Sequence, residues 1–170
     1  DTGEELAYVI ERMTTGSLDQ EMQDAINKRL HSAFYETEKL IDLQLADVKF
    51  HRIDELSMEK LELKETELSY IERIHYHIGN MMDTPFEELK WTQEEKNQLI
   101  QMVGTLSDFM KKPDEYKKSG YRKQALVLLD KFWKSKRPSQ DNRTEFFTPE
   151  VIILYELLSI FHLAEKIFEE

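Results

Sequence analysis

The amino-acid sequence predicts an all-α protein, an elongated antiparallel helical bundle with two long coiled-coil-like helices and three to four shorter ones. Three observations support this fold class. The 170 residues include only five glycines and four prolines, so few positions interrupt a helix. Charged residues make up 34% of the chain and hydrophobic residues 40%, a balance typical of long, partly exposed helices. Apolar residues also recur at spacings of three and four, which places them on one helical face. The length fits a single domain over residues 1–170.

Four local signals mark where helices begin. Residues 17–20 (SLDQ) and 92–95 (TQEE) fit capping boxes, in which side chains satisfy the free N–H groups of the first turn. Thr84-Pro85 and Thr148-Pro149 place proline at the first helical position, where its missing N–H costs nothing. The shorter elements are therefore a leading helix within residues 1–15, a helical turn at 85–89, a helix at 93–111, a helix at 113–135 with a candidate break at Ser119-Gly120, and a final apolar helix at 149–168. Residues 136–147 are predicted to form a loop.

The longest helical pattern runs from residue 18 to residue 82. Its phase is lost around residues 47–54, so we predict a turn there and two arms, each about 45 Å long at 1.5 Å per residue. One continuous rod is the alternative, but it would leave its apolar stripe without a partner. The expected stripe residues are Met22, Ile26, Leu30, Ala33, Thr37 and Leu40 in the first arm and Leu68, Ile71, Ile74, His75, Ile78, Met81 and Met82 in the second.

Charge is distributed unevenly along the chain. Residues 111–137 hold ten basic and three acidic residues, a net +7, which leaves −18 for the rest of a chain whose net charge is −11. This basic segment could pack beside acidic helices such as residues 54–72, contact an anionic membrane surface, or bind nucleic acid. The acidic body disfavours the last, so no nucleic-acid partner is expected. The candidate membrane or partner contacts are Lys117, Lys118, Arg122, Lys123, Lys134, Lys136 and Arg137.

Patterns that would indicate chemistry are missing. The chain has no cysteine, no G-x-S-x-G motif and no glycine-rich loop, so we predict a non-enzyme without cofactor or metal. Glu72 and His75 form one E-x-x-H pair, whereas carboxylate-bridged metal sites in helical bundles need two such pairs. We expect His75 beside the apolar stripe, His77 in solvent and His162 hydrogen-bonded in the core. Glycines 79 and 104 lie within helical patterns, which indicates close helix–helix contacts.

Two stretches resemble a known family. Residues 70–82 (YIERIHYHIGNMM) carry a tyrosine, then charged residues on one helical turn, then a hydrophobic run that ends in methionine. Residues 143–146 (RTEF) precede a Leu-rich final helix that contains ILYELL at 153–158. Both patterns resemble the soluble C-terminal domain of the aromatic acid exporter family of membrane proteins. The resemblance implies a membrane part upstream in the same polypeptide, with this chain on the cytoplasmic side of the cell membrane. Residues 1–15 would then follow the last membrane helix.

The function that we expect is that of a non-catalytic cytoplasmic domain of a multi-spanning membrane protein, which serves oligomerisation, regulation or partner contact. Its candidate partners are the membrane part of the same polypeptide, a second copy of the chain and an anionic membrane surface. One alternative is a free cytosolic adaptor that binds a partner helix between its long arms. A third hypothesis is a helical metal-binding protein that uses Glu72 and His75.

Overall fold

The computed structural model describes residues 2–51, 55–137 and 148–169, and all the regular structure in these ranges is helical. The predicted all-α class is therefore confirmed, and no strand occurs in the described ranges. The elements are α1 (Thr2–Thr15), α2 (Gln20–His51), α3 (Glu55–Met82), a 3-10 helix η1 (Phe86–Glu88), α4 (Gln93–Met110), α5 (Pro113–Ser119), α6 (Tyr121–Lys136) and α7 (Pro149–Glu169).

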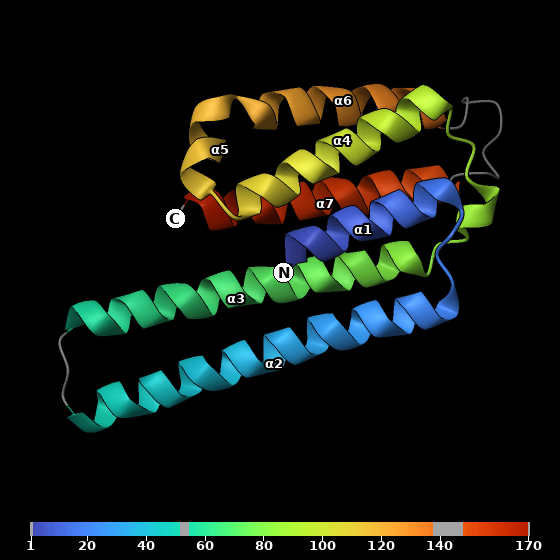
Figure 1. Cartoon of the computed structure of the whole chain (residues 1–170). Coiled ribbons are helices and arrows are strands. Elements are labelled where there is room, and N and C mark those ends of the chain that lie inside the picture. Colours follow the sequence, from blue (N-terminus) through green and yellow to red (C-terminus); the bar gives the residue numbers. More distant parts are fainter. Residues whose placement is uncertain (1, 52–54, 138–147, 170) are drawn as a thin grey trace.

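The helices form a bundle from which a long hairpin projects (Figure 1). Helices α2 and α3 run antiparallel along one side, and α4, α5 and α6 lie on the opposite side. Helices α1 and α7 lie between these groups, where α7 packs on α3 and α6, and α1 packs on α4 and α3. The free end of the hairpin extends beyond the other helices. The hairpin, rather than one continuous rod, is thus what forms.

Most helix starts lie where the local signals place them. Thr92 and Glu95 form the predicted capping box at the start of α4. The Thr148 hydroxyl accepts a hydrogen bond from the N–H of Val151 in the first turn of α7, at 3.3 Å. The capping box predicted at residues 17–20 is wrong, because α2 begins at Gln20 and the Asp19 carboxylate accepts from the N–H of Met22 at 2.9 Å instead.

The connections agree with the sequence in part. The predicted break at Ser119-Gly120 is confirmed, since Gly120 adopts φ 65°, a left-handed conformation that ends α5 and that glycine tolerates well. The turn predicted at 47–54 begins too early, because α2 continues through residue 51; residues 52–54 lie outside the described ranges. The predicted loop also begins too early, since Lys136 is the last residue of α6, and residues 138–147, with the RTEF sequence, lie outside as well.

The core lies where α7 meets α1, α3 and α6. Leu154, Leu157 and Ile160 of α7 are completely buried, as expected for the most apolar helix. Leu6 of α1 and Ile74 of α3 are buried beside them in the same hydrophobic cluster. At about 2 kcal/mol for each large side chain removed from water, this cluster dominates the stability of the bundle.

The apolar stripe of α3 is confirmed, but that of α2 is only half right. Ile26 and Leu30 are buried, whereas Ala33, Thr37 and Leu40 are exposed, Leu40 to 61%. Beyond Leu30 the face of α2 that points toward α3 is formed by other residues than predicted. Successive members of this set are separated by about one or two helical turns, which keeps them on one side of the helix. This set consists of Phe34, Ile41, Leu45 and Val48, all buried or half-buried.

The interpretation of glycines 79 and 104 as close helix contacts is wrong. A Cβ atom at either position would meet no atom within 4 Å apart from the nearby backbone of its own helix and its two chain neighbours. The close contact is made by Gly3 of α1 instead, where a Cβ would lie 3.0 Å from the Cα of Ser107 in α4. Gly3 therefore sets the distance between α1 and α4.

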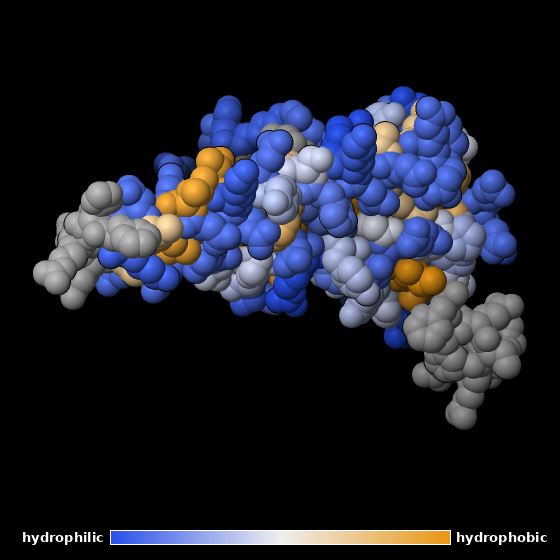
Figure 2. All heavy atoms as spheres, turned by 90° about the horizontal axis from the view of Figure 1, so that it is seen from below, coloured by the Kyte–Doolittle hydropathy of each residue, from blue (hydrophilic) through white to orange (hydrophobic). Residues whose placement is uncertain are grey.

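Hydrophobic side chains are sparse on the underside of the molecule. In the view from below most of the surface is hydrophilic, with hydrophobic atoms toward the free end of the hairpin and in a smaller patch near the opposite end of the molecule (Figure 2). Among the described residues of the hairpin, the exposed leucines are Leu40 and Leu43 of α2 and Leu63 of α3, at 61, 58 and 48%. No helix in the described part of the chain is both long and apolar enough to cross a membrane.

Candidate functional site: the basic segment and the acidic groove

Helix α6 presents the basic segment outward because four of its apolar residues turn inward. Tyr121, Ala125, Leu129 and Phe132 are buried on the inner side. The outer side, which we call the basic face, has a net charge of +3 and includes two exposed apolar side chains, Leu126 at 39% and Val127 at 63%. The basic face consists of Arg122, Lys123, Leu126, Val127, Asp130, Lys131 and Lys134, all exposed.

Six of the seven predicted contact residues are exposed to solvent. Lys117 and Lys118 on α5 and Lys123 on α6 form no ion pair within 4 Å among the described residues, and neither does Arg137 after α6. Arg122 and Lys134 do form pairs, but their side chains are still 56% and 67% exposed. The seventh residue, Lys136, turns inward and is the exception.

Among the described residues, the basic segment forms no ion pair with residues 58–72. Its ion pairs reach α1 through Lys111 and Glu4, α7 through Arg122 and Glu165, and α4 through Lys136 and Glu95. No ion pair within the described ranges joins the segment to α3, and α6 packs on α7 rather than on the hairpin. The hypothesis that the segment packs beside the acidic arm 54–72 is therefore wrong for a single copy of the chain.

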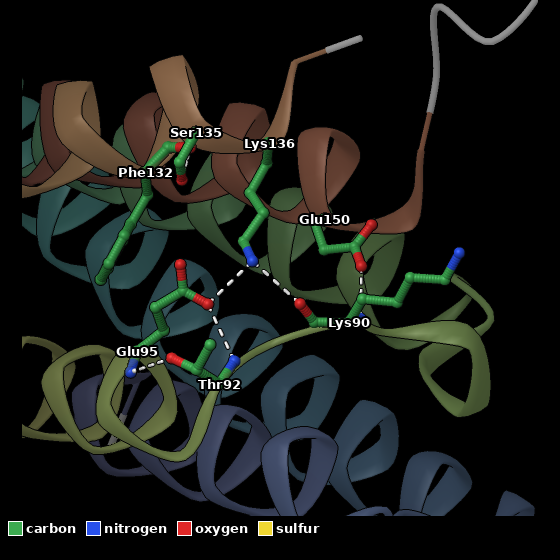
Figure 3. Close-up of polar contacts among 7 residues, drawn as sticks. All are labelled: Lys90, Thr92, Glu95, Phe132, Ser135, Lys136 and Glu150. Carbon is green, nitrogen blue, oxygen red and sulfur yellow. Dashed lines mark hydrogen bonds and ion pairs between the residues drawn. The ribbon is translucent and has the colours of Figure 1, made fainter.

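Lys136 joins three chain segments at the end of α6 (Figure 3). Its ammonium donates to the carbonyl oxygen of Lys90 at 2.8 Å and lies 2.8 Å from Oε2 of Glu95. It also lies 5.2 Å from the ring centroid of Trp91, a cation–π contact. The same Glu95 oxygen accepts from the N–H of Thr92 at 2.8 Å, so the lysine reinforces the cap of α4. This arrangement assigns Lys136 a structural role.

Two opposing effects act on the Glu95 carboxyl at this junction. Burial raises its pKa, but the hydrogen bonds from Lys136 and from Thr92 lower it by more, so the pKa lies below its ordinary value of 4.5. Glu150 at the start of α7 strengthens the same junction, since its carboxylate accepts from the N–H of Lys90. Glu95 is consequently ionised, and the junction stays intact, near neutral pH.

His75 lies in a hollow of 480 Å³ between α2 and α3. Its Nε2 is 2.8 Å from the hydroxyl of Thr2, and burial, together with the nearby His31, lowers its pKa to about 4. His75 is therefore neutral at physiological pH. Glu72 lines the same hollow but is exposed, and no group of three or more metal-ligating side chains is placed to hold a metal ion in the ranges that the structure describes.

The expectations for the other two histidines are wrong. His77 was expected in solvent, but its side chain is only 16% exposed and its Nδ1 bonds to the Glu156 carboxylate of α7. His162 was expected in the core, but it is exposed. Asn80 donates to the other Glu156 oxygen at 3.3 Å, so a buried polar cluster links α3 to α7. The sequence of α3 alone does not show which of its faces α7 covers.

A long groove runs between α2 and α3, the two arms between which the adaptor hypothesis places a partner helix, and sequence reasoning missed only its acidic lining. Three hollows of 480, 210 and 540 Å³ follow one another along the hairpin. The first and second share Phe34 and Glu72 in their lining, and the second and third share Asp42 and Glu65. They therefore form one continuous channel, which we call the acidic groove.

The acidic groove has an apolar floor and charged edges. Leu30, Phe34, Ile41, Leu45 and Leu68 form the floor. Five exposed carboxylates and a single lysine supply its charge, and none of these carboxylates forms an ion pair among the described residues. The charged residues are Glu38, Asp42, Glu65, Glu72, Asp83 and Lys49. With 34 acidic residues in the chain, only the pairing of the two arms could reveal which carboxylates gather here.

Fold and surface together define a helical-bundle domain with two oppositely charged faces. The chain is 30% identical to a UPF0421 protein of Oceanobacillus iheyensis over 128 residues, which cover 74% of this chain and 37% of that protein. It is 28% identical to a UPF0421 protein of Bacillus cereus and 27% identical to one of Bacillus thuringiensis, each over 165 residues that cover 94% of this chain and 43% of the relative. The chain thus spans less than half the length of these curated relatives. No family model and no solved structure matches it.

Proposed function

We propose that this chain is a non-catalytic cytoplasmic domain of a multi-spanning membrane protein of the aromatic acid exporter type, where it serves oligomerisation, regulation or partner contact. The observation that carries the proposal is the basic face of α6, where four exposed cations, of which Lys123 and Lys131 form no ion pair among the described residues, accompany the exposed Leu126 and Val127 on an otherwise acidic chain. Such a mixed surface is typical of a contact site. The relatives support the proposal, because the part that they share with this chain leaves more than half of each for other domains.

The parent protein provides the test. The parent gene is expressed with a C-terminal tag, and the cell lysate is separated into membrane and soluble fractions, with the membranes then washed in alkaline carbonate. We expect the tagged protein to stay in the washed membranes and its tag to be digested only in inside-out vesicles. Recovery in the soluble fraction would remove this proposal and favour the free adaptor that binds a partner helix.

We also propose that the two arms pack with coiled-coil geometry. Phe34, Ile41 and Val48 of α2 follow one another at seven-residue steps, and Leu61 and Leu68 of α3 do the same. Seven-residue spacing is typical of coiled coils. The chain has no cysteine, so spin labels can be attached to two introduced cysteines, one in each arm. A series of such pairs would measure the distance between the arms at successive positions along the hairpin. A constant separation along the hairpin supports coiled-coil packing, and arms that diverge steadily contradict it.

A further inference from the structure

The acidic groove and the basic face match one another in chemistry. The groove combines an apolar floor with five carboxylates and one lysine, and α6 combines exposed Leu126 and Val127 with the cations around them. An amphipathic basic helix is the kind of ligand that such a groove accommodates. Opposite charges on two apolar-centred surfaces favour one register and raise the association rate.

The dimensions also agree. The groove follows α2 from Asn27 to Lys49, a length of about 34 Å at 1.5 Å per residue. Helix α6 has 16 residues and is about 24 Å long. One α6 therefore fits within the groove, with room for the exposed Lys117 and Lys118 of α5 to reach carboxylates beyond its end.

These surfaces cannot meet within one copy of the chain. Helix α6 lies on the opposite side of the bundle from the hairpin, and α1 and α7 lie between them (Figure 1). We propose that α6 of a second copy docks in the acidic groove, so that this domain associates with itself through its oppositely charged faces. The inference rests on the proposed contact role and names the partner for it.

A lipid surface explains fewer of the observations. Anionic head groups would attract the basic face, but they would leave the five groove carboxylates without a partner and the apolar floor uncovered. A second copy satisfies both surfaces. Because the two surfaces differ, each contact is heterologous, so copies either exchange contacts in a closed assembly or continue as a chain.

Two charge-reversal variants test the proposal. The basic-face variant carries Lys117→Glu, Lys123→Glu and Lys131→Glu, and the groove variant carries Asp42→Lys, Glu65→Lys and Glu72→Lys. All six positions are exposed, so the helices should persist, as circular dichroism would verify. In sedimentation velocity at about 50 mM salt we expect the unmodified chain to self-associate and each variant alone to bind itself at least tenfold more weakly, since surface charges interact strongly at low salt.

The mixture of the two variants is the decisive sample. Each variant keeps the surface that the other lacks, so a 1:1 mixture should restore association and form a complex with twice the 20.3 kDa mass of one chain. A control with Lys28→Glu, Lys39→Glu and Lys60→Glu has the same net charge of −17 as the basic-face variant, six below −11. Its altered lysines do not line the groove, so it should associate at least as tightly as the unmodified chain.

Three results would overturn the proposal. The first is an unmodified chain that stays monomeric at all concentrations, and the second is a pair of variants that fail to complement one another. The third is a monomeric chain that sediments with phosphatidylserine vesicles but not with phosphatidylcholine vesicles, and that loses this binding in the basic-face variant; the basic face would then be a lipid contact. None of these results depends on whether the parent stays in membranes, so self-docking and the membrane assignment fail separately.

Discussion

Replacement of Lys136 by methionine is expected to destabilise the whole bundle. Methionine keeps most of the aliphatic stem over Trp91 but removes the ammonium, and with it the bond to the Lys90 carbonyl and the ion pair with Glu95. The Lys136 and Glu95 side chains are only 16% and 17% exposed, so water replaces the lost contacts poorly. A hydrogen bond from a charged donor contributes about 1.5–3 kcal/mol and a cation–π contact about 1 kcal/mol.

Because these contributions are not additive, we expect Lys136→Met to lower the free energy of unfolding by about 3 kcal/mol. For a chain of this size that corresponds to a fall in melting temperature of roughly 6–12 °C. Lys134→Met is the matched control, since Lys134 also pairs with a carboxylate, Asp130, but the two side chains are 67% and 56% exposed. An exposed pair of this kind contributes about 0.5 kcal/mol at most.

Urea denaturation followed by circular dichroism at pH 7 measures both variants. The pH dependence gives a second test, because the pKa of Glu95 is lowered in the folded state and its contribution is lost as pH falls below 4.5. The difference between unmodified chain and Lys136→Met should therefore shrink in acid. Equal losses for the two lysine variants, or a difference that does not depend on pH, would refute a structural role for Lys136.

Three further changes test separate parts of the structure. Gly79→Ala should stabilise the protein by about 1 kcal/mol, because a Cβ there meets open space and alanine favours a helix. Gly3→Ala should destabilise it, because a Cβ there meets the backbone of α4. Changes in melting temperature of the same sign for both variants would contradict the geometry. Glu156→Ala should cost about 3 kcal/mol in urea denaturation, since it leaves His77 without its buried partner, and a loss below 1 kcal/mol would show that the pair is unimportant. The pKa of His75 falls from 6.5 unfolded to about 4 folded, so its contribution of about 2 kcal/mol is present above pH 6.5 and lost as pH falls toward 4. Between pH 6.5 and 4 the free energy of unfolding of His75→Gln should depend on pH less steeply than that of the unmodified chain. Equal slopes for the two proteins would exclude this contribution of His75.

The sequence predicts the helices well because their ends are encoded locally. Thr92 with Glu95, Thr148 with Pro149, and Gly120 each act within one turn of the chain, so their effects need no knowledge of the rest of the fold. The exception at the start of α2 has a local cause too. Asp19 and Ser17 both favour helix caps, and only the backbone geometry shows that Asp19 takes the position.

Orientation about the helix axis is predicted less well, because it depends on neighbours from distant parts of the chain. His77 and His162 exchange their expected environments, since α7 packs on the side of α3 that carries His77 and turns His162 outward. Lys134 and Lys136 lie two residues apart, and a separation of about 200° on the helix sends one to solvent and the other to Glu95. Composition alone treats the two lysines alike.

The charge pattern has a further consequence for the choice of partner. Among the described residues, folding pairs five of the ten cations in the basic segment, and those five reach α1, α4, α5, α6 and α7 but not the hairpin. A chain that needed charge only for solubility would intersperse both signs over its surface. Here, instead, cations collect on the outer side of α5 and α6 while carboxylates line the groove between α2 and α3 on the far side. Since each surface has an apolar centre and a charge opposite to the other, salt should weaken self-association, and variants of one surface should be rescued only by variants of the other.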